Sequence, residues 1–180
     1  MSGSRSKTKG SSWEREIAKY LSEQHAASFI RAPHSGAYIG GSNVVRRQTL
    51  DQSQIKSFKG DIVPPEHWVC FNAEAKSYAD FPFHLLFQGE VPQLEQWLDQ
   101  LLKTSQPNDF NILLLKFNRK GSYIVHQLTP SLTLNQNHLI YNSKHHGLWV
   151  IEEFKTFWTR NLKTIEQICT NTATQAQNMQ

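Results

Sequence analysis

Helical periodicity of apolar residues predicts three helices in this chain. Residues three or four positions apart lie on one face of an α-helix, so apolar side chains at that spacing indicate a buried stripe. The first helix is expected over residues 13–24, after a serine cap, the second near 91–103 and the third over 149–162. The stripes comprise Trp13, Ile17, Tyr20 and Leu21, then Leu94, Trp97, Leu98, Leu101 and Leu102, then Ile151, Phe154, Trp158 and Leu162.

Shorter apolar runs predict the strands. Residues 110–117 are almost continuously apolar, which is typical of a buried strand, and 122–128 is the expected hairpin partner across a turn. Residues 61–63 are read as the end of one strand and 68–75 as another, with a turn at two prolines between them. Together with the helices, these strands predict an α/β domain.

The length of 180 residues favours one domain with tails. We expect residues 1–10 to form a flexible basic arm, 11–168 the folded domain, and 169–180 a disordered polar tail. Residues 37–59 are predicted to form a long loop, which in a compact domain is usually functional or mobile.

Charge and cysteine content narrow the class of protein. Nineteen Lys and Arg against fifteen Asp and Glu give a net charge of +4, a mild excess that suits a phosphate-bearing partner. Cys70 and Cys169 are expected to be free thiols, and their spacing does not suggest structural zinc. No apolar run approaches the roughly 20 residues needed to cross a bilayer, so we expect a soluble intracellular protein without membrane contact.

Three residues suggest a chemical activity. In a strand over 68–76, Glu74 and Lys76 point to the same face because side chains alternate with period two. Asp61 at the end of a neighbouring strand could approach Glu74 and give two oxygen ligands for Mg²⁺. Such a pair with a nearby lysine suits hydrolysis of phosphodiesters by a metal-activated water, although Glu-x-Lys alone is commonly a solvated strand face.

The order of several motifs makes the assignment more specific. Residues 9–16 (KGSSWERE), 29–36 (FIRAPHSG), 60–63 (GDIV) and 72–76 (NAEAK) follow one another, and a later hairpin covers 113–130. This order resembles the PD-(D/E)XK nuclease superfamily and, more closely, the archaeal-type Holliday-junction resolvases, a group that also occurs in viruses. The resemblance spans roughly residues 9 to 130.

The resemblance implies a restriction-endonuclease-like fold, in which helices flank a mixed β-sheet, and a homodimer that cuts four-way DNA junctions on paired strands. It implies that Mg²⁺, which Mn²⁺ could replace, is held by Asp61, Glu74 and the backbone carbonyl of Ala75. Glu14 would join them, directly or through water, and Lys76 would be the catalytic lysine. The family's usual proline before the aspartate is Gly60 here.

Basic residues are expected to contact DNA. The resemblance places Arg31 and Ser35 against DNA near the active site, and cationic residues of the arm, first helix and loop add phosphate contacts. Lys116, at the end of an apolar strand, is either a further phosphate contact or a snorkelling lysine. The additional expected contacts are Lys9, Arg15, Arg46, Arg47, Lys56 and Lys59.

Several alternatives stay open at this point. Glu16 competes with Glu14, but the two lie about 200° apart on a helix, so both cannot face one site. His34 is either a general base or an exposed turn residue, and adjacent His145 and His146 rarely chelate one ion. Gln93 and Gln96 are either site glutamines or a solvated helix face. Tyr38, Phe58, Tyr78, Phe81 and Phe83 are core residues or stack on unpaired bases.

Two other functions compete with junction resolution. One is a different nuclease of the same superfamily, with a restriction-like, repair or nicking activity. The other is a branched-DNA-binding protein without catalysis. Fold alone cannot separate these activities.

Overall fold

The structure is a computed structural model that describes residues 3–32 and 59–170, of which 3–9 are described as backbone only. Five strands form a mixed sheet in the order β3-β4-β5-β7-β6, with β3 and β4 parallel and the other pairs antiparallel. These strands are β3 (Phe71–Tyr78), β4 (Phe110–Phe117), β5 (Gly121–Gln127), β6 (Leu139–Ser143) and β7 (Gly147–Glu153). A separate antiparallel pair joins β1 (Ile30–Arg31) to β2 (Ile62–Val63).

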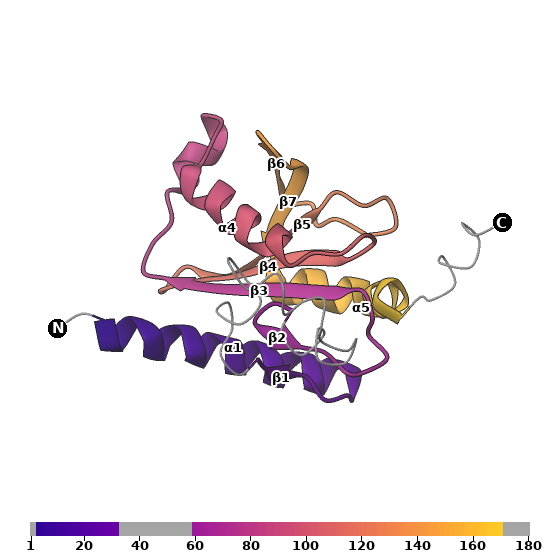
Figure 1. Cartoon of the computed structure of the whole chain (residues 1–180). Helices are drawn as coiled ribbons and strands as arrows, with labels where there is room; N and C mark the ends of the chain where they lie inside the picture. Colours follow the sequence, from indigo (N-terminus) through magenta and orange to yellow (C-terminus); the bar gives the residue numbers. More distant parts are fainter. Residues whose placement is uncertain (1–2, 33–58, 171–180) are drawn as a thin grey trace.

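Helices cover both faces of the five-stranded sheet (Figure 1). Helices α1 (Gly3–His25) and α5 (Phe154–Thr170) pack on one face, where Trp13, Phe157 and Trp158 share a buried cluster. Helix α4 (Pro92–Lys103) packs on the other face, and a short 3-10 helix, η2 (Phe83–Phe87), precedes it. The expected α/β restriction-endonuclease-like architecture is therefore confirmed.

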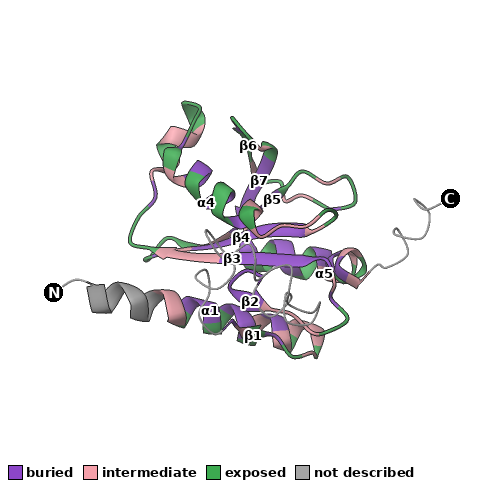
Figure 2. Cartoon of the chain, viewed as in Figure 1, coloured by how far each residue is buried: buried purple, intermediate pink, exposed green. Residues whose placement is uncertain are grey.

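Burial follows the expected periodicities (Figure 2). β4 is buried at nearly every position because it lies between β3 and β5 with helices on both faces. On α4 the inward stripe includes Leu94, Trp97, Leu98 and Leu101, all predicted from their spacing. The expected hairpin of 110–117 with 122–128 is present as β4 and β5, whose bounds differ from the prediction by one residue at most.

The C-terminal part differs from its prediction. Residues 147–153 form β7, not the start of a helix, and α5 begins at Phe154. The Glu153 carboxylate accepts hydrogen bonds from the backbone amides of Lys155 and Thr156, which caps the helix at this point. Apolar Ile151 fits both the period of a strand and that of a helix, so a prediction from spacing alone began the helix too early. The strand β6, which pairs with β7, was not predicted.

Both proposed domain boundaries also shift. α1 begins at Gly3, so most of the expected flexible arm is helical backbone, because extending a nucleated helix costs little per residue. α5 continues to Thr170, and Cys169 is buried with its carbonyl accepting the amide of Cys70 at 3.1 Å. The expected tail from 169 is thus wrong at its first two residues, and 171–180 and the 37–58 part of the long loop lie outside the described residues. In the described ranges, no helix is long and apolar enough to span a membrane.

Candidate active site

Asp61 and Glu74 are brought together by hydrogen bonds between Asp61, the residue just before β2, and β3. The amide of Asp61 donates to the carbonyl of Ala73 at 2.8 Å, and the Asp61 carboxylate accepts the amide of Ala75 at 2.9 Å. Asp61 is therefore hydrogen-bonded to the two residues of β3 that flank Glu74, Ala73 and Ala75. Asp61 approaches Glu74, as its place at the end of a neighbouring strand predicted, and both residues are only 5% exposed.

Gly60 allows this close approach of β2 to β3. Its φ is +71°, and a Cβ at this position would lie 2.3 Å from the carbonyl oxygen of Ala73. Proline is restricted to a φ near −65°, so it could not adopt this conformation. The glycine that departs from the superfamily's usual proline is therefore required by the backbone found here.

Glu74, Lys76 and Gln100 form a closed hydrogen-bonded group between β3 and α4. The Lys76 ammonium donates to Glu74 Oε1 at 2.7 Å and to Gln100 Oε1 at 2.8 Å. The Gln100 amide donates to Glu74 Oε1 at 2.6 Å. The lysine thus has a fixed position on the same face as Glu74, as strand alternation predicted.

A glutamine that the sequence did not single out reaches the site from this helix. Gln93 and Gln96 were either site glutamines or a solvated helix face, and it is Gln100, one turn beyond Gln96, that contacts the acid and the lysine. Gln96 is exposed. The available signal was the neighbouring core stripe: Gln100 lies three residues after buried Trp97, which faces the sheet.

Burial, followed by the charge of neighbouring Asp61, raises the pKa of Glu74 to about 7 against the opposing effect of Lys76. Two carboxylates in a dry site repel each other when both are ionised. A divalent cation between them would remove that repulsion and favour the ionised form.

The donor set fits a hard divalent cation. Asp61, Glu74 and the carbonyl of Ala75 offer oxygen atoms, which Mg²⁺ prefers while keeping several waters. In the described ranges, no group of three His, Cys, Asp or Glu side chains could hold a metal ion. An ion at the two carboxylates would therefore complete its coordination with backbone oxygen and water.

Glu14 lies on α1 and forms an ion pair with Arg31 of β1. The amide of Ala32 donates to the carbonyl of Asp61 at 2.9 Å, so the strand that carries Arg31 is tied directly to the acid. Glu16, its competitor, pairs with Lys116 on the molecular surface. This agrees with the prediction that only one of the two glutamates faces inward.

Among the expected DNA contacts, Lys59 is in the wrong place. It is 5% exposed and forms an ion pair with buried Asp109, so it cannot reach a phosphate. A buried ammonium without a carboxylate would be too costly, which explains the pairing. Arg15 is exposed, and Lys116 lies 5.0 Å from the Trp13 ring centre while paired with Glu16. The structure gives no side-chain position for Lys9, and His34, Ser35, Arg46, Arg47 and Lys56 lie outside the described residues.

The adjacent histidines His145 and His146 have separate ring positions, and His146 contacts Asp99. His146 Nε2 lies 2.7 Å from Asp99 Oδ1, and the His145 and His146 ring centres are 6.2 Å apart. These residues are in the turn between β6 and β7, away from the strand that carries Glu74.

The fold and the paired acids with their lysine define the class as a restriction-endonuclease-like nuclease. A model of the family described as "phage putative PDDEXK endonuclease" matches residues 5–175, and the chain belongs to this family. The match supports the PD-(D/E)XK superfamily that the motif order resembled, and it does not specify the archaeal-type junction resolvases. No curated protein and no solved structure matches the chain.

Proposed function

We propose that this protein is a Mg²⁺-dependent endonuclease that hydrolyses phosphodiester bonds of DNA. The observation that carries the proposal is the buried Asp61–Glu74 pair beside a lysine that two acceptors hold in place. A stable pair of buried acids needs a positive partner, and Lys76 supplies only one charge. The site is therefore suited to a divalent cation and an anionic substrate.

The roles of the residues follow from their positions. Asp61, Glu74 and the Ala75 carbonyl would hold Mg²⁺, with Glu14 contributing through a metal-bound water. When bound, the ion supplies an activated water and neutralises charge on the phosphate. Lys76 orients that water or stabilises charge on the scissile phosphate, and its fixed position reduces the reorganisation that this requires.

DNA would approach along the outer side of α1 and β1. Arg15 is exposed there, and Arg31 is 35% exposed in its side chain despite its ion pair with Glu14. Lys116 could release Glu16 and bind phosphate, since an exposed ion pair contributes little to stability. The remaining contacts proposed from the sequence are Lys9, Ser35, Arg46, Arg47 and Lys56.

The specific substrate proposed is the four-way junction, cut on paired strands by a homodimer. The support for this is the order of motifs over residues 9–130, which resembles the junction resolvases. Two coordinated cuts require two sites, and a two-fold dimer supplies them by symmetry. Another nuclease activity of the same superfamily, or branched-DNA binding without cleavage, are the competing functions.

The test compares substrates at fixed salt. Wild type and Glu74→Ala are incubated with a labelled four-way junction or a matched linear duplex, in Mg²⁺, Mn²⁺ or EDTA. We expect paired cuts in the junction only, dependent on the metal and at least about a hundredfold slower in Glu74→Ala. Glu23→Ala is the control, because that glutamate is 61% exposed and pairs only with exposed Lys19 in the described structure.

Each other outcome has a definite meaning. Equal cutting of both DNAs would exclude junction selectivity and leave a general nuclease. Binding of intact junctions with either metal would exclude catalysis and favour the binding protein. Unchanged cleavage by Glu74→Ala would remove this glutamate from the active site.

A further inference from the structure

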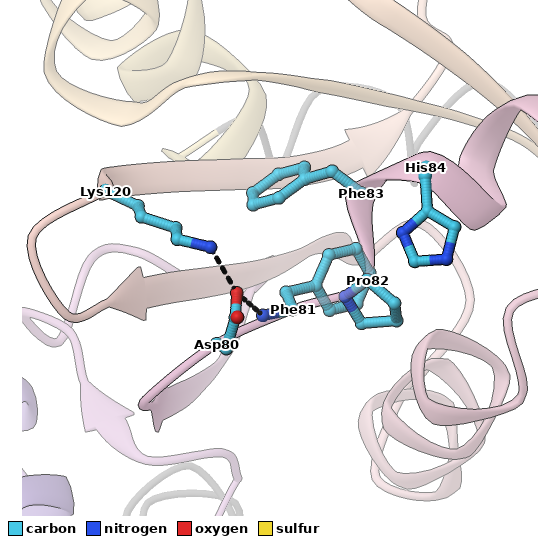
Figure 3. A pocket seen from close by; sticks show the side chains of 6 residues that line it. All are labelled: Asp80, Phe81, Pro82, Phe83, His84 and Lys120. Atoms are coloured by element: carbon cyan, nitrogen blue, oxygen red, sulfur yellow. Dashed lines mark hydrogen bonds and ion pairs between the residues drawn. The ribbon is translucent and has the colours of Figure 1, made fainter.

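A hollow of about 470 Å³ lies just beyond the end of β3, outside the group formed by Glu74, Lys76 and Gln100. Its lining comes from the segment after β3 and from the turn between β4 and β5, and Figure 3 shows the six side chains around it. The lining residues are Asp80, Phe81, Pro82, Phe83, His84 and Lys120. This volume lies within the range of pockets that bind small organic groups.

Aromatic contacts hold one wall of the hollow in a fixed orientation. The Phe83 ring lies 5.1 Å from Phe81, 5.4 Å from Phe117 and 5.3 Å from Tyr123, measured between ring centres. Phe81 is itself stacked against Trp97 and Phe117 in the core. A ring fixed in this way can stack on a nucleobase without losing much side-chain freedom.

Asp80 and Lys120 give the hollow an acceptor beside a donor. The Lys120 ammonium and the amide of Phe81 both donate to Asp80 Oδ1, which leaves Oδ2 to accept from a ligand (Figure 3). Both side chains are about half exposed or more, and such a pair contributes little to stability. The hydrogen bond from Lys120 lowers the pKa of Asp80, so the carboxylate is ionised at neutral pH.

The hollow is close to the proposed catalytic lysine. Asp80 follows Lys76 by four residues, so their Cα atoms are at most about 14 Å apart. That distance equals roughly four base-pair steps of B-DNA. A DNA strand with its phosphate at Lys76 could therefore place a nearby nucleotide at the hollow.

We propose that this hollow binds a guanine base turned out of the DNA a few nucleotides from the cut, an inference that rests on the proposed function. The Watson–Crick edge of guanine presents two adjacent N–H donors beside the O6 acceptor. Asp80 Oδ2, the oxygen that Lys120 and the Phe81 amide do not use, accepts from the two donors, Lys120 donates to O6, and Phe83 stacks on the ring. The site thereby selects DNA in which a base near the cut is unpaired or easily extruded.

The test measures binding without cleavage. In the Glu74→Gln background, fluorescence anisotropy at fixed salt gives Kd for duplexes with one unpaired G, A, C or T and for the fully paired duplex. We expect the unpaired-G duplex to bind roughly tenfold more tightly than the unpaired-T duplex, in line with one specific base contact. Asp80→Asn should bring this ratio close to one, and Phe83→Leu should weaken all four unpaired duplexes relative to the paired one.

Glu90→Gln is the matched control, because Glu90 is a similarly exposed acid that pairs with Lys144. It should leave the G-to-T ratio unchanged. A ratio near one in the Glu74→Gln protein, or a ratio that Asp80→Asn does not change, would overturn the guanine site. Absence of any DNA binding would overturn both proposals. If only the proposed nuclease function were wrong, the wild-type enzyme would leave DNA intact, while the G-to-T ratio of Kd values would stay as expected.

Discussion

The position of Asp61 depends on the residue before it. Gly60 combines a left-handed backbone with close contact to the Ala73 carbonyl, and both features exclude a side chain. The carboxylate that would bind metal is therefore positioned by a residue that carries no chemistry. Gly60 acts by letting the backbone just before β2 pass close to Ala73 of β3.

Gly60→Ala should destabilise the protein by about 2–4 kcal/mol, because backbone strain and a contact with a backbone atom act together. Gly147→Ala is a matched control: its φ is +74°, and nothing lies within 4 Å of the added Cβ. That variant should lose only about 1–2 kcal/mol. Urea unfolding of both variants measures the difference. Equal losses would show that the contact with Ala73 has no energetic effect.

At the scale of elements, α4 contributes one residue to the site. Gln100 reaches across to β3 and contacts both the acid and the lysine, so the packing of α4 on the sheet determines their geometry. The Gln100 amide donates to the Glu74 carboxylate and, in the proposed mechanism, would orient it toward the metal.

Gln100→Leu should reduce cleavage and Mg²⁺ affinity by about 10–100-fold, the usual effect of removing a residue that orients a ligand. Gln96→Leu, one turn earlier on the exposed face, should change neither. Cleavage rates over a Mg²⁺ titration separate the two effects, and thermal melting checks that both variants are folded. Equal behaviour of the two variants would show that Gln100 does not orient the site.

At the scale of the whole molecule, the buried acids of the candidate active site reduce stability at neutral pH. The folded-state pKa of Glu74, about 7, lies above the ordinary value of 4.5, mainly because the group is buried. The folded protein therefore binds more protons than the unfolded chain between these values. The contribution of the protonated Glu74 to stability is fully present below pH 4.5 and is lost as the pH rises through about 7.

Metal-free protein should accordingly melt at lower temperature as the pH rises from about 4.5 to 7, and Glu74→Gln should reduce this slope. Mg²⁺ should raise the melting temperature of the wild type at pH 7 and have a smaller effect at pH 5, because binding displaces the proton. Calorimetry with and without metal measures both changes. An identical slope in wild type and Glu74→Gln would show that Glu74 does not titrate in this range.

Much of the fold was determined by local patterns in the sequence. The stripe on α4, the apolar run of β4 and its hairpin with β5 were predicted nearly to the residue, since each depends on a periodicity within one segment. Strand alternation also placed Glu74 and Lys76 on one face. The approach of Asp61 to Glu74 was predicted from its place at the end of a neighbouring strand, and the hydrogen bonds of Asp61 with Ala73 and Ala75 agree with it.

Tertiary structure decided the features that depend on partners distant in the sequence. The apolar residues of β7 fit either a helix or a strand, and they form a strand because β5 and β6 pair with them. Glu153 caps the helix that follows. Lys59 is buried and paired with Asp109, far from it in the sequence. Gln100, and neither Gln93 nor Gln96, contacts Glu74, because packing sets the register of helix against sheet. Residue type and spacing fix which faces are apolar, whereas the contacts made across those faces decide which polar side chains meet.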